Sequence, residues 1–377
     1  GGGGGAPTYT RVARAQLDRE RLAAVRRDAA SMRERQRRKH LDVGYSDAKG
    51  EGTHELALSL IDATEELLAP LTSLLGAALA DAPCTTIALC LDRSLCDLPI
   101  EALGVLSGVT TARDYSVGFH LARLKGGDAG DKIDQGALRY ICDPRNEDLE
   151  GPSGSVQRDE GLGVISVALK DDVVGSGKWE GVLGAEAYPS QGELQRTLRG
   201  ASMLLYAGIS TFLASVEPYL VAPLSLPALQ CVVLLDRADN EPSYRAQSKV
   251  DTSTISSILS LRDPFATCAL LSLRGAKCVV SNQWNTDASS NHARCKDMIT
   301  AILDGGETVG AAVASTGVGK VKVYRDAVAA AAAAKKAHEE AAEKYAEKQR
   351  EKEEKAALKA AEKAKRLEKK ERLAAER

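Results

Sequence analysis

The stretch "QCVVLLDRADNEP", residues 230–242, joins an apolar run to a strongly polar segment. Val232 to Leu235 are all apolar, and the chain turns polar at Asp236 and Arg237. Unbroken apolar runs are typical of strands that are covered on both faces, as in a parallel sheet. In open α/β sheets, ligands bind just beyond the carboxyl ends of such strands. The stretch therefore predicts an α/β fold and marks the place where a catalytic residue would stand.

Comparable segments lie on either side of this stretch. Short apolar runs predict further strands at 85–92, 136–144, 201–210 and 277–284, and an additional edge strand at 163–169. Leu and Ala at helical spacing predict helices at 55–80, 264–276 and 292–306, with a break at Pro70 and a C-cap at Gly275. Strands that alternate with helices indicate a largely parallel sheet covered on both faces. We therefore expect one α/β domain over residues 54–306.

The segments that flank this domain differ in composition. Residues 1–53 contain a glycine tract and an Arg-rich stretch, which predicts a basic helix that either needs a partner surface or stays solvated, and we favour the solvated helix. Residues 307–323 are expected to be a linker. Residues 324–377 contain no Gly and no Pro, and their Ala, Glu, Lys and Arg favour one long charged helix. Large apolar side chains are too sparse there for a strong coiled coil.

The overall composition argues against several classes of function. The net charge is −2, which favours neither nucleic acid nor an anionic membrane as a partner. No apolar run approaches the roughly 18–20 residues that a membrane span needs. The eight cysteines include no Cys-x-x-Cys pair and lie mostly in strand-like runs, so we expect buried, reduced thiols of a cytosolic protein. We expect no metal site and no cofactor.

Six segments in sequence order carry a resemblance to a known family. They are "LDRSLCDLPIEAL" (91–103), "RYICDPRNEDLEG" (139–151), "WEGVLGAEAYPSQGEL" (179–194), "LLYAGIS" (204–210), "VVLLDRADN" (232–240) and "LRGAKCVVSNQWNTD" (273–287). Together they resemble the CHAT/separase branch of the caspase-like cysteine peptidases. The resemblance implies a caspase-like three-layer sandwich with a mostly parallel sheet, which agrees with the alternation of strands and helices.

The residues that perform the chemistry of this family are replaced here. In the family, the strand at 204–210 ends in a segment that carries the general base, a His. The next strand of the family ends in Gly-Cys, and that Cys is the nucleophile. Ile209 and Arg237 stand at these two positions. The reaction needs a thiolate beside a base, whereas isoleucine exchanges no proton and arginine stays protonated. The resemblance therefore implies a degenerate peptidase without a catalytic residue.

Other residues leave alternatives open. Cys142, Cys231 and His120 are candidates for a displaced dyad, although Cys231 begins its strand roughly 20 Å from the polar end. Trp284 and Asp287 match part of the specificity segment of the family, from which one residue is missing, and Trp284 is also expected to be a core aromatic.

The sequence favours a non-catalytic scaffold in a larger assembly. Arg237 is either an exposed charge paired with Asp236 or Asp239, or a contact for a partner protein in the former substrate cleft. The chain is also similar to the carboxy-terminal part of TPR-containing cilia- and flagella-associated proteins of the axonemal central pair. That resemblance implies a cytoskeletal location in a cilium or flagellum, partners in a microtubule-associated assembly, and no small-molecule substrate.

Two other functions stay open. One is an active cysteine peptidase with a displaced dyad. The other is a module whose basic segment, 11–39, and charged tail bind an acidic polymer, nucleic acid or tubulin tails. Binding of that kind would depend steeply on salt.

Overall fold

The structure, a computed structural model, describes most of the α/β region. The described residues are 17–38, 51–81, 86–126, 132–147, 178–184, 187–236, 254–284 and 288–316. Residues 1–321 and 322–377 separate into two units, and all described residues belong to the first. The predicted helix at 324–377 and the predicted edge strand at 163–169 lie outside the described residues, as do Arg237 and Asp287.

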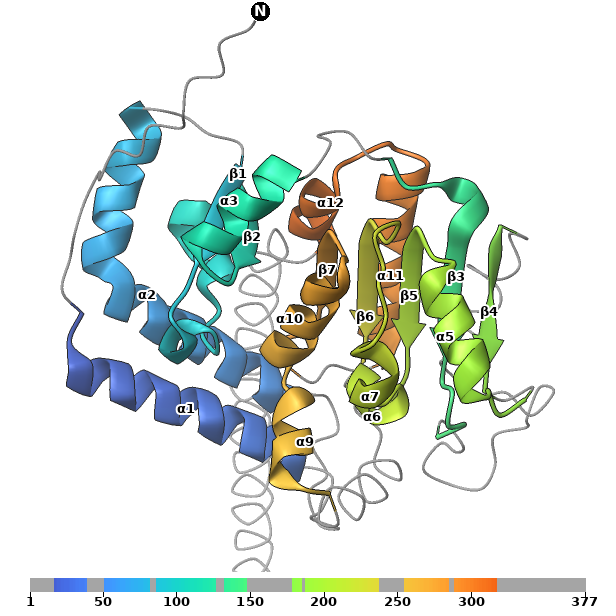
Figure 1. Ribbon diagram of the computed structural model, residues 1–377. Helices are drawn as coiled ribbons and strands as arrows, with labels where there is room; N and C mark the ends of the chain where they lie inside the picture. Colours follow the sequence, from blue (N-terminus) through green and yellow to red (C-terminus); the bar gives the residue numbers. More distant parts are fainter. Residues whose placement is uncertain are drawn as a thin grey trace, which may run out of the picture. The chain divides into compact units, whose positions relative to one another are not determined.

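A five-stranded parallel sheet forms the centre of the fold, in the order β4-β3-β5-β6-β7 (Figure 1). Its strands are β3 (Leu138–Cys142), β4 (Trp179–Leu183), β5 (Met203–Ala207), β6 (Cys231–Leu235) and β7 (Cys278–Ser281). Every residue of β5 and β6 is buried, as their unbroken apolar runs predict. The fold class expected from the sequence, α/β with a mostly parallel sheet, is confirmed.

Helices cover both faces of this sheet and make the three layers. One face carries α5 (Gln191–Arg199), α6 (Phe212–Ser215), α7 (Pro218–Val221) and α10 (Pro264–Arg274). The other face carries α11 (Ala288–Leu303) and α12 (Val309–Thr316). Alternate residues of β5 serve the two cores, since Leu204 and Tyr206 face the first set of helices while Leu205 faces the second.

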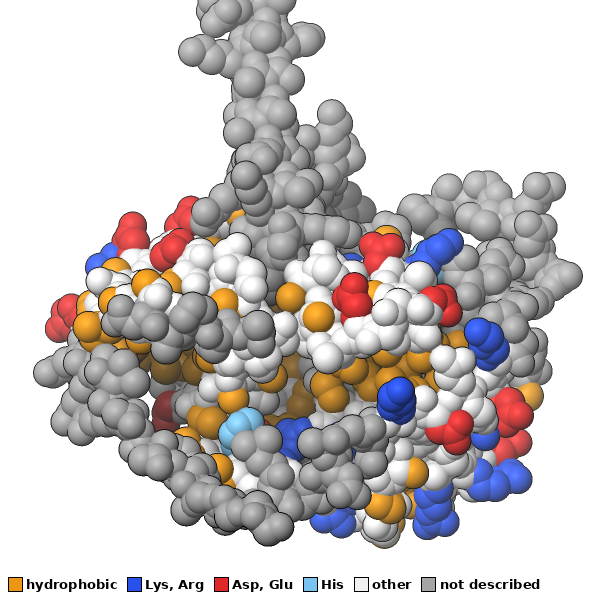
Figure 2. All heavy atoms as spheres, turned by 90° about the horizontal axis from the view of Figure 1, so that it is seen from above, with side chains coloured by type: hydrophobic (Ala, Val, Ile, Leu, Met, Phe, Trp, Pro, Cys, Tyr) orange, Lys and Arg blue, Asp and Glu red, His pale blue; other side chains and the backbone are white. Residues whose placement is uncertain are grey.

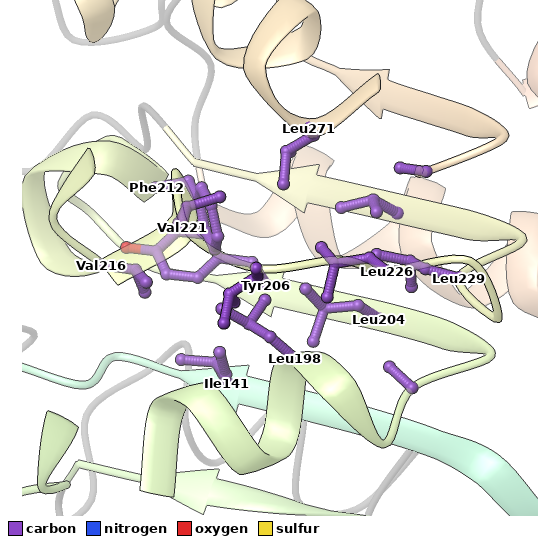
Figure 3. Close-up of a cluster of buried hydrophobic side chains, with 14 of the residues drawn as sticks. Ile141, Leu198, Leu204, Tyr206, Phe212, Val216, Val221, Leu226, Leu229 and Leu271 are labelled. Atoms are coloured by element: carbon purple, nitrogen blue, oxygen red, sulfur yellow. The ribbon is translucent and has the colours of Figure 1, made fainter. Parts of the chain in front are cut away.

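Figure 3 shows the first of these cores around Tyr206. The rings of Tyr206 and Phe212 meet edge to face, with centroids 5.2 Å apart and planes at 86°. Leu198 of α5 and Leu271 of α10 complete the packing from two helices that lie far apart in the sequence. Burial of each such side chain contributes about 1.5–3 kcal/mol.

Two strands form a separate sheet. β1 (Thr86–Cys90) and β2 (Thr110–Asp114) pair in parallel with each other. The strand predicted at 85–92 is therefore present but is not part of the main sheet. Its residues alternate between exposed and half-buried, because only Ile87 and Leu89 pack under the helices of a third core. Short 3-10 helices, η1 (Arg93–Leu95), η2 (Ile100–Ala102) and η3 (Gly104–Leu106), connect the two strands.

The edge strand β4 was not predicted from the sequence. Its pattern is broken by Glu180 and Gly181, both of which are exposed. Gly181 is required by the close approach of β3, because a Cβ atom there would lie 2.0 Å from the carbonyl oxygen of Tyr140. The position of β4 depends on close backbone contact at Gly181, and a pattern of apolar residues does not reveal such a contact.

The basic N-terminal helix packs on a partner surface, which is the less favoured of the two alternatives that its sequence left open. Helix α1 (Arg19–Arg38) packs against α2 (Glu51–Asp81), and its Val25 and Ala29 are buried in the third core (Figure 1). The thin apolar stripe is sufficient because the partner surface belongs to the same chain. The predicted break at Pro70 is a bend, since α2 continues through the proline as two segments that meet at an angle (Figure 1).

The remaining described elements complete the connections. They are α3 (Val117–Gly126), η4 (Gln135–Ala137) and α9 (Ser256–Leu261). Part of the expected linker at 307–323 is the helix α12, which buries Ala312 against the sheet because its small residues allow close packing. Gly275 ends α10 with a φ of 121° and donates its N–H to the last turn, so the C-cap prediction is confirmed.

Candidate functional site

The candidate site is the edge of the main sheet where its strands end. Because β3 to β7 are all parallel, their carboxyl ends lie at one edge, and the segments that follow them meet there. Ile209 follows β5 at this edge, and Asp236 is the last described residue after β6. The two strand ends at which the resemblance places the base and the nucleophile therefore belong to neighbouring strands, β5 and β6. Arg237 itself lies outside the described residues.

The segment after β5 is folded inward. Ile209 is 4% exposed, so the side chain at the base position of the family belongs to the core. The hydroxyl of Tyr206 donates to the carbonyl oxygen of Ser210 at 3.0 Å and lies 3.0 Å from the Ser215 hydroxyl. Gly208 fits beneath this hydroxyl, because a Cβ atom there would lie 2.7 Å from it. Burial raises the pKa of Tyr206 well above its usual value, which keeps the phenol protonated as a donor.

The end of β6 is held by hydrogen bonds on two sides. The Asp236 carboxylate accepts the backbone N–H of Phe212 at 3.0 Å, which fixes the start of α6. The side-chain amide of Asn282 donates to the carbonyl oxygen of Asp236 at 3.0 Å and to the Asn291 side chain at 2.8 Å. Asp236 is buried, so its carboxylate acts as a structural acceptor between β6 and the segment after β5.

The end of β3 joins the same network. Asp143, whose φ is 39°, accepts the backbone N–H of Glu147 at 2.9 Å and donates its own N–H to Ala207 at 2.7 Å. The Glu147 carboxylate in turn accepts the hydroxyl of Ser210. Arg145 donates to the carbonyl oxygen of Ala214. Hydrogen bonds therefore connect the segments that follow three strands, β3, β5 and β6. The sequence does not predict these partners, because they come from distant segments.

Two polar groups near this edge differ from the rest. Within the part of the chain that the structure describes, the Thr211 hydroxyl and the side-chain nitrogen of Asn291 are buried without a hydrogen-bond partner. Such groups cost free energy unless something satisfies them. Both groups lie beside the hydrogen bonds that hold the ends of β5 and β6, where Asn291 accepts from Asn282 and Thr211 precedes Phe212.

The candidates for a displaced dyad lie far apart. His120, on α3, contacts Asp114 of β2 at 2.9 Å between its Nδ1 and the carboxylate. Cys142 ends β3. Three strand spacings lie between β3 and β7, the strand of the main sheet on the side of β2, so Cys142 is more than about 14 Å from β2. Cys231 begins β6, about 17 Å from Asp236 at the other end of that strand. The separation of Cys142 from the β2 side exceeds the hydrogen-bond reach that catalysis requires.

Two thiols of the core, those of Cys231 and Cys268, have a raised pKa. Contact with Cys278, together with burial, holds the pKa of the Cys231 thiol well above its usual value. Burial raises the pKa of the Cys268 thiol to about 11. A thiolate is the reactive form, so neither group is activated at neutral pH.

The segment after β7 contacts the connection between β1 and β2. The side-chain amide of Gln283 donates to the carbonyl oxygens of Cys96 at 3.0 Å and Leu98 at 3.4 Å. Trp284 packs against the third core, which confirms its interpretation as a core aromatic. The segment that resembles a specificity motif therefore joins the end of β7 to the connection between β1 and β2 and to the third core.

Within the described ranges, no helix is long and apolar enough to cross a membrane. Among the same residues, no group of three or more His, Cys, Asp or Glu side chains is placed to hold a metal ion. The expectation that the protein needs no cofactor stays a prediction.

Comparison with known proteins gives one kind of match. No family model and no curated protein matches the chain. Two crystal structures of the Saccharomyces cerevisiae separase–securin complex match with TM-scores of 0.44 and 0.45, each at 13% sequence identity. Each match covers 82% of this chain and 22% of the matched chain in the complex. This chain therefore spans about a fifth of the length of the matched chain. At this identity and TM-score, the likeness carries no argument about chemistry or partners.

Proposed function

We propose that this domain is a non-catalytic scaffold, a degenerate peptidase domain that binds other proteins of a larger assembly. The observation that supports it most is the buried Ile209 beside a strand end whose carboxylate, Asp236, holds backbone rather than a reacting group. A catalytic base has to exchange protons with a neighbouring nucleophile, and an isoleucine has none to exchange.

A thiol-reactive activity probe tests the absence of a nucleophile. We would treat the folded chain with a biotinylated peptidyl acyloxymethyl ketone in a Cys90→Ala background, because Cys90 is exposed and would react without catalysis. We expect no stoichiometric labelling at neutral pH. Labelling of one cysteine at one equivalent, lost when that cysteine is replaced by Ala, would instead establish an active peptidase with a displaced dyad.

The finer proposal concerns the assembly. By its sequence resemblance, we place the domain in the microtubule-associated central apparatus of a cilium or flagellum, where it would support motility. A fluorescently tagged chain produced in a ciliated cell should stay with the axoneme after detergent extraction. Recovery of all the tagged chain in the detergent-soluble fraction would contradict this assignment.

A second candidate function is binding of an acidic polymer by the charged segments. Residues 19–31 of α1 carry several exposed Arg side chains, while the opposite side of the helix is buried against α2. Binding through such charges loses affinity steeply with salt. Titration with polyglutamate at about 50 and 200 mM salt separates the two functions, because scaffold contacts through apolar surface change little over that range.

A further inference from the structure

A cavity of about 400 Å³ lies between the two sheets, lined by residues of β2 and β7. Phe265 and Cys268 of α10 line it from one helical layer, and Val309 and Val313 of α12 line it from the other. It is therefore a space in the strand layer of the sandwich. Figure 2 shows hydrophobic side chains in a hollow that crosses the upper face of the molecule. Volumes of about 300–1,000 Å³ are typical of ligand sites.

The walls of this cavity are strand edges rather than strand faces. Consecutive residues line it from both strands, Thr111 to Tyr115 of the β2 side and Lys277 to Ser281 of the β7 side. Side chains of a strand alternate between its two faces, so a wall made by consecutive residues presents the edge and its main chain. Among the described strands, β2 pairs only with β1 and β7 only with β6.

The direction of the peptide groups of β7 follows from its pairing with β6. The N–H of Cys278 donates to the carbonyl oxygen of Gln230 at 3.0 Å, next to the registered partner Cys231. Peptide groups alternate along a strand, so those of Cys278 and Val280 serve β6 while those of Val279 and Ser281 point toward the cavity. An open edge of this kind is a template for another strand.

The charged residues around the cavity are already matched within the protein. Arg113 pairs with Glu101 and donates to the carbonyl oxygens of Cys96 and Leu98. The Asp114 carboxylate contacts His120 and Arg123. Main-chain groups and apolar side chains thus remain to recognise an occupant, which argues against an ionic ligand.

We propose that this cavity is a docking cleft for one extended segment of a partner protein, which adds as a strand to the edge of β7. The occupant is about as long as β7 and β2, which have four and five residues. Both of its faces meet apolar helices, so its side chains are small or β-branched. Strand addition gives affinity through the main chain and specificity through side-chain pockets. The inference rests on the proposed function only in assuming a protein partner.

The test uses the full 377-residue chain and a defined peptide pool. The probe is a pool of fluorescein-labelled octapeptides with Lys at both ends and Ala, Val, Ile or Thr at the central positions. We expect saturable binding by fluorescence anisotropy. Amide hydrogen exchange at single-residue resolution should slow at least tenfold at Val279 and Ser281 and stay unchanged at Cys278 and Val280. A pool N-methylated at alternate central positions should lose most of its affinity.

Matched variants separate the cavity from the rest of the surface. Val313→Trp places a large side chain in the cavity and should weaken binding at least tenfold. Val117→Trp makes the same change at an exposed position on α3 that does not line the cavity and should leave binding unchanged. If Val313→Trp fails to fold, the N-methylated pool still decides the question on the wild-type chain.

Three results would overturn the proposal. They are unchanged exchange at Val279 up to millimolar peptide, equal binding of the N-methylated pool, and equal binding by the Val313→Trp and Val117→Trp chains. Stoichiometric labelling by the activity probe would contradict the proposed scaffold function. It would not affect the docking cleft if slower amide exchange is observed at Val279 and Ser281 of β7. Failure of the cleft and failure of the scaffold function are therefore distinguishable.

Discussion

Replacement of Tyr206 by Phe is the most direct probe of the inward fold after β5. The hydroxyl of Tyr206 is fully buried and links β5 to the carbonyl oxygen of Ser210 and to the hydroxyl of Ser215, each at 3.0 Å. Phe keeps the ring and its edge-to-face contact with Phe212, so the change removes these two hydrogen bonds and little else.

The magnitude follows from the two bonds. A hydrogen bond inside a protein contributes a net stabilisation of about 0.5–1.5 kcal/mol, so two together contribute about 1–3 kcal/mol. The buried area of the ring hardly changes, and the hydrophobic contribution therefore stays constant. We expect Tyr206→Phe to lower the free energy of unfolding by about 2 kcal/mol, toward the middle of this range.

The assay is urea denaturation followed by far-ultraviolet circular dichroism, with the slope of the transition as a check that compactness is unchanged. Tyr219→Phe is the matched control, because that exposed hydroxyl accepts one hydrogen bond from Gln191 at 2.7 Å and its loss should cost less than about 0.5 kcal/mol. A double-mutant cycle with Ser215→Ala should give a coupling energy of about 1 kcal/mol. If Tyr206→Phe is no less stable than Tyr219→Phe, our account of the segment after β5 is wrong.

Three further outcomes are expected. Gly181→Ala should destabilise the sheet by more than about 2 kcal/mol, because its Cβ would lie 2.0 Å from a carbonyl oxygen of β3; thermal denaturation that matches wild type would show otherwise. The capping box of α5 lowers the pKa of Glu193 through the Ser190 N–H, so its stabilisation is complete above the ordinary glutamate pKa and is lost as the pH falls through the lowered one. Glu193→Gln should therefore flatten the acid side of the stability–pH profile, and an unchanged profile would contradict this. Iodoacetamide at pH 8 should alkylate Cys90 well before Cys268, whose pKa is about 11; mass spectrometry that finds Cys268 labelled first would refute the order.

The sequence predicts the parts of the fold that depend on hydrophobic pattern. The unbroken runs of β5 and β6 lie side by side at the centre of the sheet, where both faces are covered. The edge strand β4 escaped prediction because contact through Gly181 determines its place. The apolar run at 85–92 predicts a strand of the main sheet, whereas β1 pairs with β2 in a separate sheet. Strand pairing depends on tertiary neighbours, which a local apolar pattern does not identify.

The candidate site was predictable in position but not in content. The alternation of strands and polar segments locates the residues after β5 and β6, and Ile209 indeed lies at that edge. The partners of that edge were not predictable, because Glu147 reaches Ser210 and Asp236 reaches Phe212 across long stretches of chain. Hydrogen bonds between distant segments depend on tertiary geometry, which no local spacing records.

The polar groups at the sheet edge and the open cavity lead to one view of how this domain would bind. At the carboxyl ends of β5 and β6, the Ser210 hydroxyl donates to the Glu147 carboxylate and the Asp236 carboxylate accepts the N–H of Phe212, so these groups are engaged within the fold. At the edge of β7, by contrast, the peptide group of Val279 points into a space bounded by apolar helices. Unpaired main chain is the group that a folded protein most needs to satisfy. The part of the sheet with the greatest capacity for a partner is therefore its open strand edge, not the strand ends where an enzyme of this fold class would hold a substrate.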